Sequence, residues 1–277
     1  MKTSAIADIH LITFSPTGTS RKIGIAIAQG TGIETIAIDD LTQDCEATLT
    51  FHTRQLVVIT VPVYGGHVAP TALQRMKSLQ GNNTPAVLVA VYGNRHYEQA
   101  LEELHTFVSG QGFRVIAAGA FIGEHSYSTP ETPIAAGRPD SSDLLCANRF
   151  GSEIGKKLSA SSSPAEIDVK DVALPTHPQE AIMQFKQTVM GWMKQGIQMP
   201  SVPLVDTNLC NNCTTCSLIC PTSAIPTCDP TETDAQACIK CCACVKGCPT
   251  GARSFPTPFA PLLVQQFSAC QENHTLV

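Results

Sequence analysis

A repeated cysteine pattern near the carboxyl end constrains this chain more than any other feature. Residues 210–221 read CNNCTTCSLICP, and residues 238–249, which start 28 positions later, read CIKCCACVKGCP. Both segments follow the spacing C-x2-C-x2-C-x3-C-P. Of the 13 cysteines in the chain, ten lie between positions 210 and 248. In a reducing compartment, cysteine at this density indicates metal binding rather than structural disulfides.

The spacing predicts two [4Fe–4S] clusters with crossed ligands. Three closely spaced thiolates wrap three corners of a cubane, and the cysteine before proline ligates the cubane of the other repeat. The first set is Cys210, Cys213, Cys216 and Cys248. The second set is Cys238, Cys241, Cys244 and Cys220. Zinc and disulfides are the alternatives, because C-x2-C pairs also bind zinc. The Cys-Pro ending, which occurs twice, favours clusters.

Five cysteines stand outside these two sets. Cys228 and Cys242 lie within the repeat region but outside the standard spacing. Cys242 is expected to be a small buried residue, with a replacement ligand as the alternative. Cys45, Cys146 and Cys270 have no recognisable partners.

Short apolar runs alternate with amphipathic stretches over the first 160 residues. The runs predict strands at 9–14, 33–38, 56–63, 86–92 and 114–122. The stretches between them predict helices at 19–29, 70–79, 95–109 and 141–158. This alternation is typical of an α/β fold with a five-stranded parallel, doubly wound sheet. Residues 39–54 fit the pattern least well.

The loop after the first predicted strand is rich in hydroxyl groups. It reads Ser15-Pro16-Thr17-Gly18-Thr19-Ser20 and leads into a helix. A helix N-terminus offers unpaired N–H groups and partial positive charge, so it binds anions readily. The loop matches neither the P-loop nor the G-x-G-x-x-G pattern, which favours a monophosphate. A plain strand-to-helix turn is the alternative.

Two further loops combine aromatic residues with glycine. One contains Tyr64, Gly65 and Gly66 after the third predicted strand. The other contains Tyr92, Gly93, Asn94 and Tyr97 after the fourth. A planar ring system suits such loops, because it stacks on an aromatic face and hydrogen-bonds to bare backbone.

With these three loops, residues 8–158 resemble the flavodoxins, which bind FMN. Together with the cysteine repeat, the chain resembles flavodoxin–ferredoxin fusion proteins of anaerobic bacteria and archaea, and the stretches 93–98 and 133–140 look like parts of that family. The resemblance implies that Ser15, Thr17, Gly18, Thr19 and Ser20 hold the phosphate. It also implies that Tyr64, Gly65, Gly66, Tyr92, Gly93, Asn94 and Tyr97 flank the flavin ring. Pro16 departs from the pattern by removing one N–H donor.

The resulting domain prediction has four parts. Residues 1–160 form the flavodoxin-like domain, and residues 161–202 form a linker with a bridging helix. Residues 203–256 form a small α+β ferredoxin-like domain, and residues 257–277 are a tail without a recognisable motif. Trp192 on the bridging helix is expected to pack between domains, with flavin stacking as the alternative.

The loop after the fifth strand contains Glu124 and His125. Because histidine titrates near neutral pH, these residues are candidates for delivering a proton to a substrate over the flavin. The alternative is a hydrogen-bonded loop that packs against the ferredoxin-like half.

The net charge and the hydropathy of the chain exclude some classes of binding partner. A net charge of −5 and a pI near 5.9 argue against nucleic acid or an anionic membrane. No apolar run approaches the ~18 residues of a membrane span. We therefore expect a cytoplasmic location.

The sequence predicts an electron-transfer protein that passes single electrons between the clusters and FMN. Because no nicotinamide fingerprint is visible, a separate ferredoxin or another low-potential protein is expected to supply them. The electrons could pass within one chain or between the two chains of a homodimer, and the sequence leaves both routes as alternatives. A reductase with its own small organic substrate is the alternative function, and a redox sensor is a weaker one.

Overall fold

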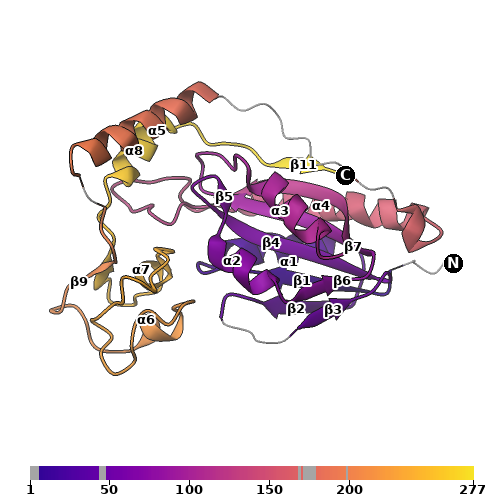
Figure 1. Cartoon of the computed structure of the whole chain (residues 1–277), viewed down its shortest axis with the longest axis horizontal. Helices are drawn as coiled ribbons and strands as arrows, with labels where there is room; N and C mark the ends of the chain where they lie inside the picture. Colours follow the sequence, from indigo (N-terminus) through magenta and orange to yellow (C-terminus); the bar gives the residue numbers. More distant parts are fainter. Residues whose placement is uncertain (1–5, 44–47, 168–169, 171–178, 198) are drawn as a thin grey trace.

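The computed structural model describes residues 6–43, 48–167, 170, 179–197 and 199–277. Cys45, much of the predicted linker and part of the irregular stretch at 39–54 lie outside these residues. The amino-terminal half is a layered α/β domain, and a smaller cysteine-rich unit lies beside it (Figure 1). Within the described residues, no helix is long and apolar enough to cross a bilayer.

Five parallel strands form the centre of the amino-terminal domain. They are β1 (Asp8–Thr13), β2 (Ile36–Asp40), β4 (Gln55–Tyr64), β7 (Thr84–Tyr92) and β8 (Phe113–Ile122). Their order is β2-β1-β4-β7-β8, with every pair parallel. Numbered among themselves, the strands run 2-1-3-4-5, which is the flavodoxin-like order. The predicted parallel, doubly wound sheet is therefore confirmed.

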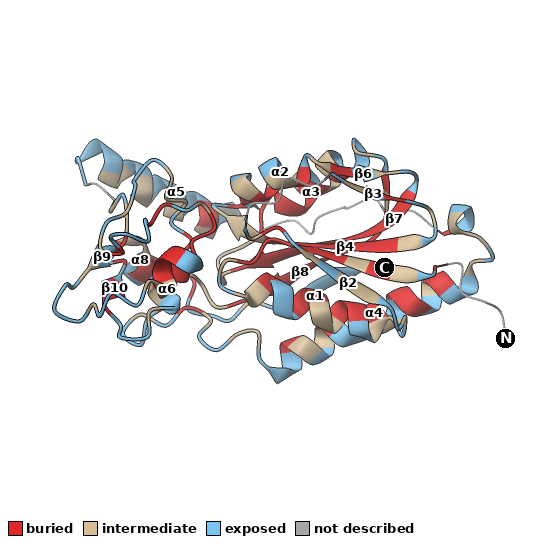
Figure 2. Cartoon of the chain, turned by 90° about the horizontal axis from the view of Figure 1, so that it is seen from below, coloured by how far each residue is buried: buried red, intermediate tan, exposed pale blue. Residues whose placement is uncertain are grey.

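Helices cover both faces of this sheet. They are α1 (Thr19–Gly30) and α4 (Ser141–Ala160) on one face, and α2 (Pro70–Met76) and α3 (Ala100–Ser109) on the other. Successive residues of β4 alternate between the two cores: Leu56 packs with α1 and α4, whereas Val57 packs with α2 and α3. Figure 2 shows buried residues along β4 and β8 and on the sheet-facing sides of the helices. Two-sided burial explains why these strands read as continuous apolar runs.

The sheet is larger than predicted. The tail adds β11 (His274–Leu276), which pairs antiparallel with β8, and β5 (His67–Val68) pairs antiparallel with β4. A separate parallel pair joins β3 (Leu49–Phe51) to β6 (Leu79–Gly81). The predicted tail, which has no recognisable motif, thus supplies a strand of the sheet. Three residues are too few to show a hydrophobic period, so only contact with the sheet edge defines this strand.

The helix predicted at 95–109 begins later than expected, at Ala100. The backbone before it has positive φ at Asn94 (65°) and Glu98 (39°), which interrupts a helix. A short 3-10 helix, Pro164–Glu166, follows α4.

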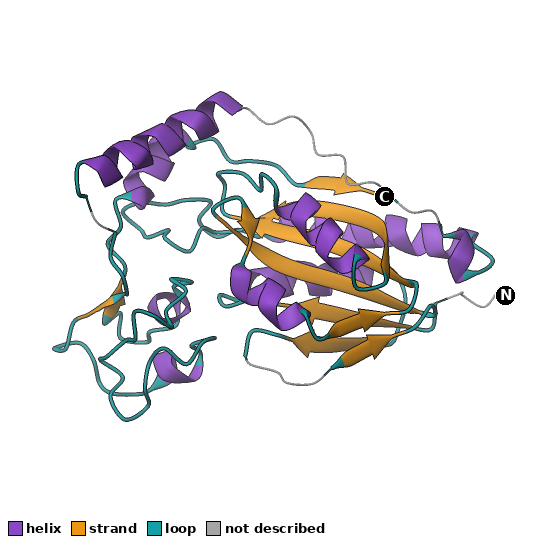
Figure 3. Cartoon of the chain, in the orientation of Figure 1, coloured by secondary structure: helices purple, strands orange, loops and turns teal. Residues whose placement is uncertain are grey.

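The cysteine-rich unit is small and consists mainly of loops (Figure 3). It contains the antiparallel pair β9 (Leu204–Val205) and β10 (Arg253–Ser254) and the short helices α6 (Thr215–Leu218) and α7 (Ala243–Lys246). Two further helices, α5 (Gln179–Lys194) and α8 (Phe259–Gln266), pack together beside the unit (Figure 1). Trp192 of α5 contacts Phe259 of α8, with ring centroids 6.1 Å apart.

Candidate cofactor sites

A cavity of about 580 Å³ opens at the carboxyl ends of the parallel strands. We call it the strand-end cavity. It lies where the strand order reverses between β1 and β4, the position at which doubly wound sheets bind ligands. Its size falls within the ~300–1,000 Å³ of small-molecule and cofactor pockets.

The hydroxyl-rich loop forms one part of the cavity wall. The lining includes the predicted residues Ser15, Thr17, Thr19 and Ser20. Gly18, the N-cap residue, has φ of 79°, which turns the chain into α1. The N–H groups of Thr19 and Ser20, the first two of α1, remain available to an anion. Ser15 is partly committed, because its hydroxyl accepts the Arg21 N–H at 3.0 Å.

Only some residues of the two loops that were predicted to flank the ring line the cavity. Tyr64, Gly65, Tyr92 and Gly93 line the cavity. Gly93 needs its bare backbone, because a Cβ atom there would lie 2.5 Å from the His125 ring. Burial raises the pKa of Tyr64 well above its ordinary value, and the nearby Cys241 and Cys242 add to the effect.

Gly66, Asn94 and Tyr97 do not line the cavity. A Cβ atom on Gly66 would collide with the Glu98 side chain at 2.6 Å. Asn94 is buried against the tail, and Tyr97 is 1% exposed and stacks on His96. These three residues therefore stabilise the loops from behind and do not face the cavity.

Glu124 and His125 line the cavity in forms that do not suit proton delivery. Burial opposes the ionisation of Glu124, but hydrogen bonds from Lys246 (2.6 Å) and the Gly137 N–H outweigh it and lower the pKa. Burial, with Arg95 and Lys246 adding to it, lowers the pKa of His125 to about 4. His125 Nδ1 accepts the Tyr127 N–H at 3.0 Å. At neutral pH, Glu124 is thus an ion-paired carboxylate and His125 a neutral imidazole.

The far wall comes from segments that the sequence did not assign to the site. Side chains of α5, α8 and the second cysteine repeat contribute Phe185, Lys186, Val189, Met190, Phe259, Leu263, Ile239 and Lys240. The apolar spacing on α5 was a signal of packing, but it carried no information about the partner surface.

An ion-pair network fastens α5 to the loop after β7. Glu98 pairs with Arg95 (2.5 Å) and with Lys186 of α5 (2.7 Å). The Arg95 guanidinium also lies 5.3 Å from the Phe185 ring centroid. Lys240, by contrast, forms no ion pair with any residue that the structure describes.

Two smaller cavities lie in the cysteine-rich unit. One is lined by all four cysteines of the second set, with Cys242, Ile239 and Lys240. The other is lined by all four cysteines of the first set. Each fourth cysteine, Cys220 or Cys248, therefore lies with the three cysteines of the opposite repeat, as crossed ligation requires. No three metal-binding side chains among the described residues are grouped tightly enough for a single ion.

The backbone of the two repeats is the same where it bends. Positive φ angles occur at Asn212 and Thr214 in the first repeat (57° and 59°) and at the matching Lys240 and Cys242 in the second (56° and 59°). Successive N–H groups in such turns form concave sites for anions, including iron–sulfur clusters. The loop geometry thus fits the cofactor that the spacing predicts.

The thiol chemistry also fits. Burial raises the pKa of Cys241 to about 12 and that of Cys244 to about 11, so these thiols stay neutral without a metal. Bound iron would supply the positive charge that ionises them. None of the described cysteines forms a disulfide.

Comparison with known proteins finds similarity among solved structures. No family model and no curated protein sequence matches the chain. A flavodoxin from the domain Archaea is 13% identical and covers 55% of this chain and 98% of its own, with a TM-score of 0.36. Rubredoxin oxygen:oxidoreductase from the anaerobe Desulfovibrio gigas is 15% identical over 56% of this chain and 36% of its own, with a TM-score of 0.36. A flavone reductase is 8% identical over 58% of this chain and 65% of its own, with a TM-score of 0.40.

Proposed function

We propose that this chain is an electron-transfer protein that binds one FMN in the strand-end cavity and one [4Fe–4S] cluster at each cysteine set. The cubane clusters carry single electrons, and FMN accepts or donates one or two. Two successive one-electron transfers from an external low-potential donor protein would thus reduce one flavin fully. The proposed fold of residues 203–256 is that of a small two-cluster ferredoxin.

One observation carries this proposal. Ile239 and Lys240 line both the strand-end cavity and the cavity of the second cysteine set. These two residues are thus a wall shared by the two sites. The first set shares no lining residue with the strand-end cavity among the residues described. The arrangement supports the order FMN, second set, first set within one chain, which requires no second copy.

Further contacts hold the second set against the amino-terminal domain. Arg75 of α2 donates to the carbonyl oxygen of Pro221, the residue after Cys220, at 2.5 Å. Lys246 at the end of α7 donates to Glu124 and to the Ser128 carbonyl oxygen, at 2.6 and 2.7 Å. These bonds fix the shared wall, so they support a defined spacing between the proposed cofactors.

Different residues of the strand-end cavity would bind the phosphate and the ring of FMN. Ser15, Thr17, Thr19, Ser20 and the start of α1 would bind the phosphate. Tyr64 and Tyr92 offer aromatic faces, while Gly65 and Gly93 offer backbone groups to the ring edge. The helices α5 and α8 exclude water from the far side.

The reductase alternative receives less support. It needs a proton donor at Glu124 or His125, but the first is paired with Lys246 and the second is neutral at physiological pH. An organic acceptor would also have to share the cavity with FMN and with the wall formed by α5, α8 and the second repeat.

The deciding experiment is the cofactor content of protein purified without oxygen. The proposal expects about one FMN and roughly eight irons with matching sulfide per chain, as two cubanes require. Chemically reduced protein, mixed with candidate electron acceptors, should then lose electrons to redox proteins rather than to small organic molecules. Iron without flavin, or zinc in place of iron, would contradict the proposal.

A further inference from the structure

The segment after α8 returns from the cysteine-rich side to the amino-terminal sheet. Its last residues form β11, in which Thr275 pairs with Gly119 of β8. Between α8 and β11, the segment passes the loops at the carboxyl ends of β7 and β8, which border the strand-end cavity (Figure 1). We call residues 267–276 the strap.

The strap is hydrogen-bonded to Asn94 in the loop after β7. The Asn94 amide donates to the carbonyl oxygens of Phe267 (2.7 Å) and Ala269 (3.1 Å), and its oxygen accepts the Gln271 N–H at 3.0 Å. Asn94 is 3% exposed and has positive φ, so both its side chain and its backbone are specialised. These three hydrogen bonds of the Asn94 side chain are thus all made with the strap rather than with the cavity.

The strap also orients a side chain of the cavity wall. The Tyr92 hydroxyl donates to the carbonyl oxygen of Glu272 at 2.7 Å, while the residue lines the cavity. Burial raises the pKa of Tyr92, so the phenol keeps the proton that it donates.

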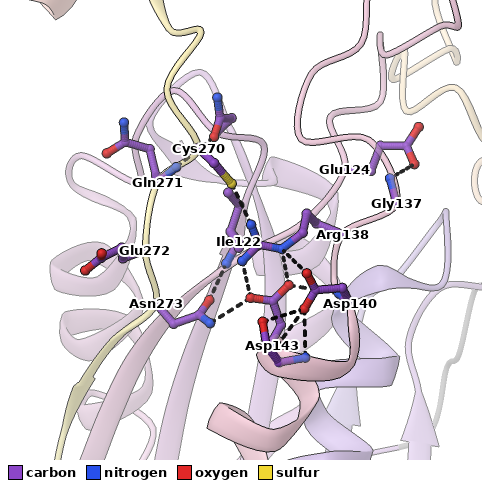
Figure 4. A network of polar contacts seen from close by, with 12 residues as sticks. Ile122, Glu124, Gly137, Arg138, Asp140, Asp143, Cys270, Gln271, Glu272 and Asn273 are labelled. Atoms are coloured by element: carbon purple, nitrogen blue, oxygen red, sulfur yellow. Dashed lines mark hydrogen bonds and ion pairs between the residues drawn. The ribbon is translucent and has the colours of Figure 1, made fainter.

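A third contact joins the strap to the end of β8. Asn273 accepts the Ile122 N–H at 2.9 Å and donates to Asp143 at the start of α4, also at 2.9 Å. Asp143 in turn pairs with Arg138, which donates to Cys270 of the strap (Figure 4). The strap is therefore bonded to both loops and to the helix beside them.

From these contacts we infer that the strap is a positioning element of the FMN site, acting through Tyr92, Asn94 and Asn273. The inference rests on the proposed function. Because the strap continues from α8, whose Phe259 and Leu263 line the cavity, it links packing of the cysteine-rich side to the shape of the flavin site. Loss of the strap contacts should weaken FMN binding while both cysteine sets keep their iron.

Three full-length variants test this inference. Asn273→Ala removes two strap bonds, and Tyr92→Phe removes only the hydroxyl that reaches the strap. Gln271→Ala is the matched control, because that side chain reaches only Ala269 of the strap itself, at 3.5 Å. Flavin release on dilution, followed by fluorescence, gives the FMN affinity. Iron content, far-UV circular dichroism and the visible circular dichroism of bound flavin are measured on the same samples.

We expect about a tenfold loss of FMN affinity for Asn273→Ala and for Tyr92→Phe, the worth of a typical hydrogen bond. Tyr92→Phe should also alter the visible circular dichroism of the flavin, because its ring loses a fixed orientation. Gln271→Ala should match the wild type. Equal affinity in all four proteins, or a loss of affinity together with iron and helical signal, would overturn the inference. Wild-type protein without FMN would instead refute the proposed function.

Discussion

The two cysteine sets share one spacing and one backbone course, yet their surroundings differ. In the first set Cys213 is exposed, and the Thr215 hydroxyl, 3.3 Å away, lowers its pKa. In the second set Cys241 occupies the matching position, is 8% exposed, and has its pKa raised by burial. A spacing that predicts a cluster site therefore does not specify the surroundings of that site. Contact with the amino-terminal domain makes the difference.

The 28-residue offset pairs each position of one repeat with a position of the other. Lys240 corresponds to Asn212, Cys242 to Thr214, and Lys246 to Leu218. In the second repeat these residues lie toward the amino-terminal domain. Lys240 lines the strand-end cavity, Cys242 lies near Tyr64, and Lys246 pairs with Glu124. Exchanging such residues makes the second repeat resemble the first and tests the comparison directly.

The largest effect is expected from removing one ligand of either set. Cys241→Ala and Cys213→Ala should each lose about four of roughly eight irons. If the second set adjoins the flavin, Cys241→Ala should abolish flavin reduction by a protein donor, whereas Cys213→Ala should slow it. Stopped-flow absorbance at the flavin band measures both rates, with FMN content as the control. Equal rates in the two variants would show that the sets are interchangeable.

Lys240→Asn gives the second repeat the residue of the first. Lys240 is the cation of the shared wall without an ion-pair partner among the described residues, so its charge is free to stabilise reduced, more negative FMN. We expect the flavin midpoint potential to fall by ~59 mV for a one-electron couple, a tenfold change in the equilibrium. Lys194→Asn, at the end of α5, is the control for net charge. An unchanged potential would place the Lys240 charge too far away to matter.

Lys246→Leu imitates Leu218, the exposed counterpart in the first repeat. It removes the half-buried pair with Glu124 and is expected to cost about 1 kcal/mol. The unfolding temperature should fall by roughly 2–4 °C. A double-mutant cycle with Glu124→Gln isolates the pair, and full additivity of the two changes would mean that the pair contributes nothing.

Acid should lower the stability of the fold through His125, whose pKa is lowered by burial and by the charges of Arg95 and Lys246. The folded pKa of this residue is about 4, below its ordinary value near 6.5, so the folded state favours the neutral form. Stability that is present above pH 6.5 is therefore lost as the pH falls toward 4. His125→Asn should show a flatter fall of the unfolding temperature over this range. Parallel curves for the variant and the wild type would contradict the assigned shift.

Cys242→Thr, which copies Thr214, is expected to leave the cofactor content unchanged. Cys242 is 1% exposed and stands outside the second set. Iron content should stay near eight, and stability should fall by about 1 kcal/mol because a hydroxyl is buried in place of a thiol. A loss of iron would instead make Cys242 a ligand.

Local pattern explains most of what could be predicted. The apolar runs placed all five parallel strands, and the hydroxyl-rich loop was found at the start of α1, because strand and helix periods are short-range properties. The helix predicted at 95–109 was too long, because positive φ angles at Asn94 and Glu98 interrupt it and no local pattern predicts them. Residues such as Phe185 and Lys240 carry no local mark of a site.

The sequence by itself determined the α/β sheet, the anion-binding type of loop, and two sets of four cysteines with matched spacing. Each of these follows from residues within about a dozen positions of one another, or from a repeat that is visible in the letters. Only the tertiary structure decided which set adjoins the strand-end cavity, why His125 stays neutral, and that the tail becomes β11. Those outcomes depend on burial and on contacts between residues more than a hundred positions apart, such as Tyr92 with Glu272 and Glu124 with Lys246. No local spacing encodes them.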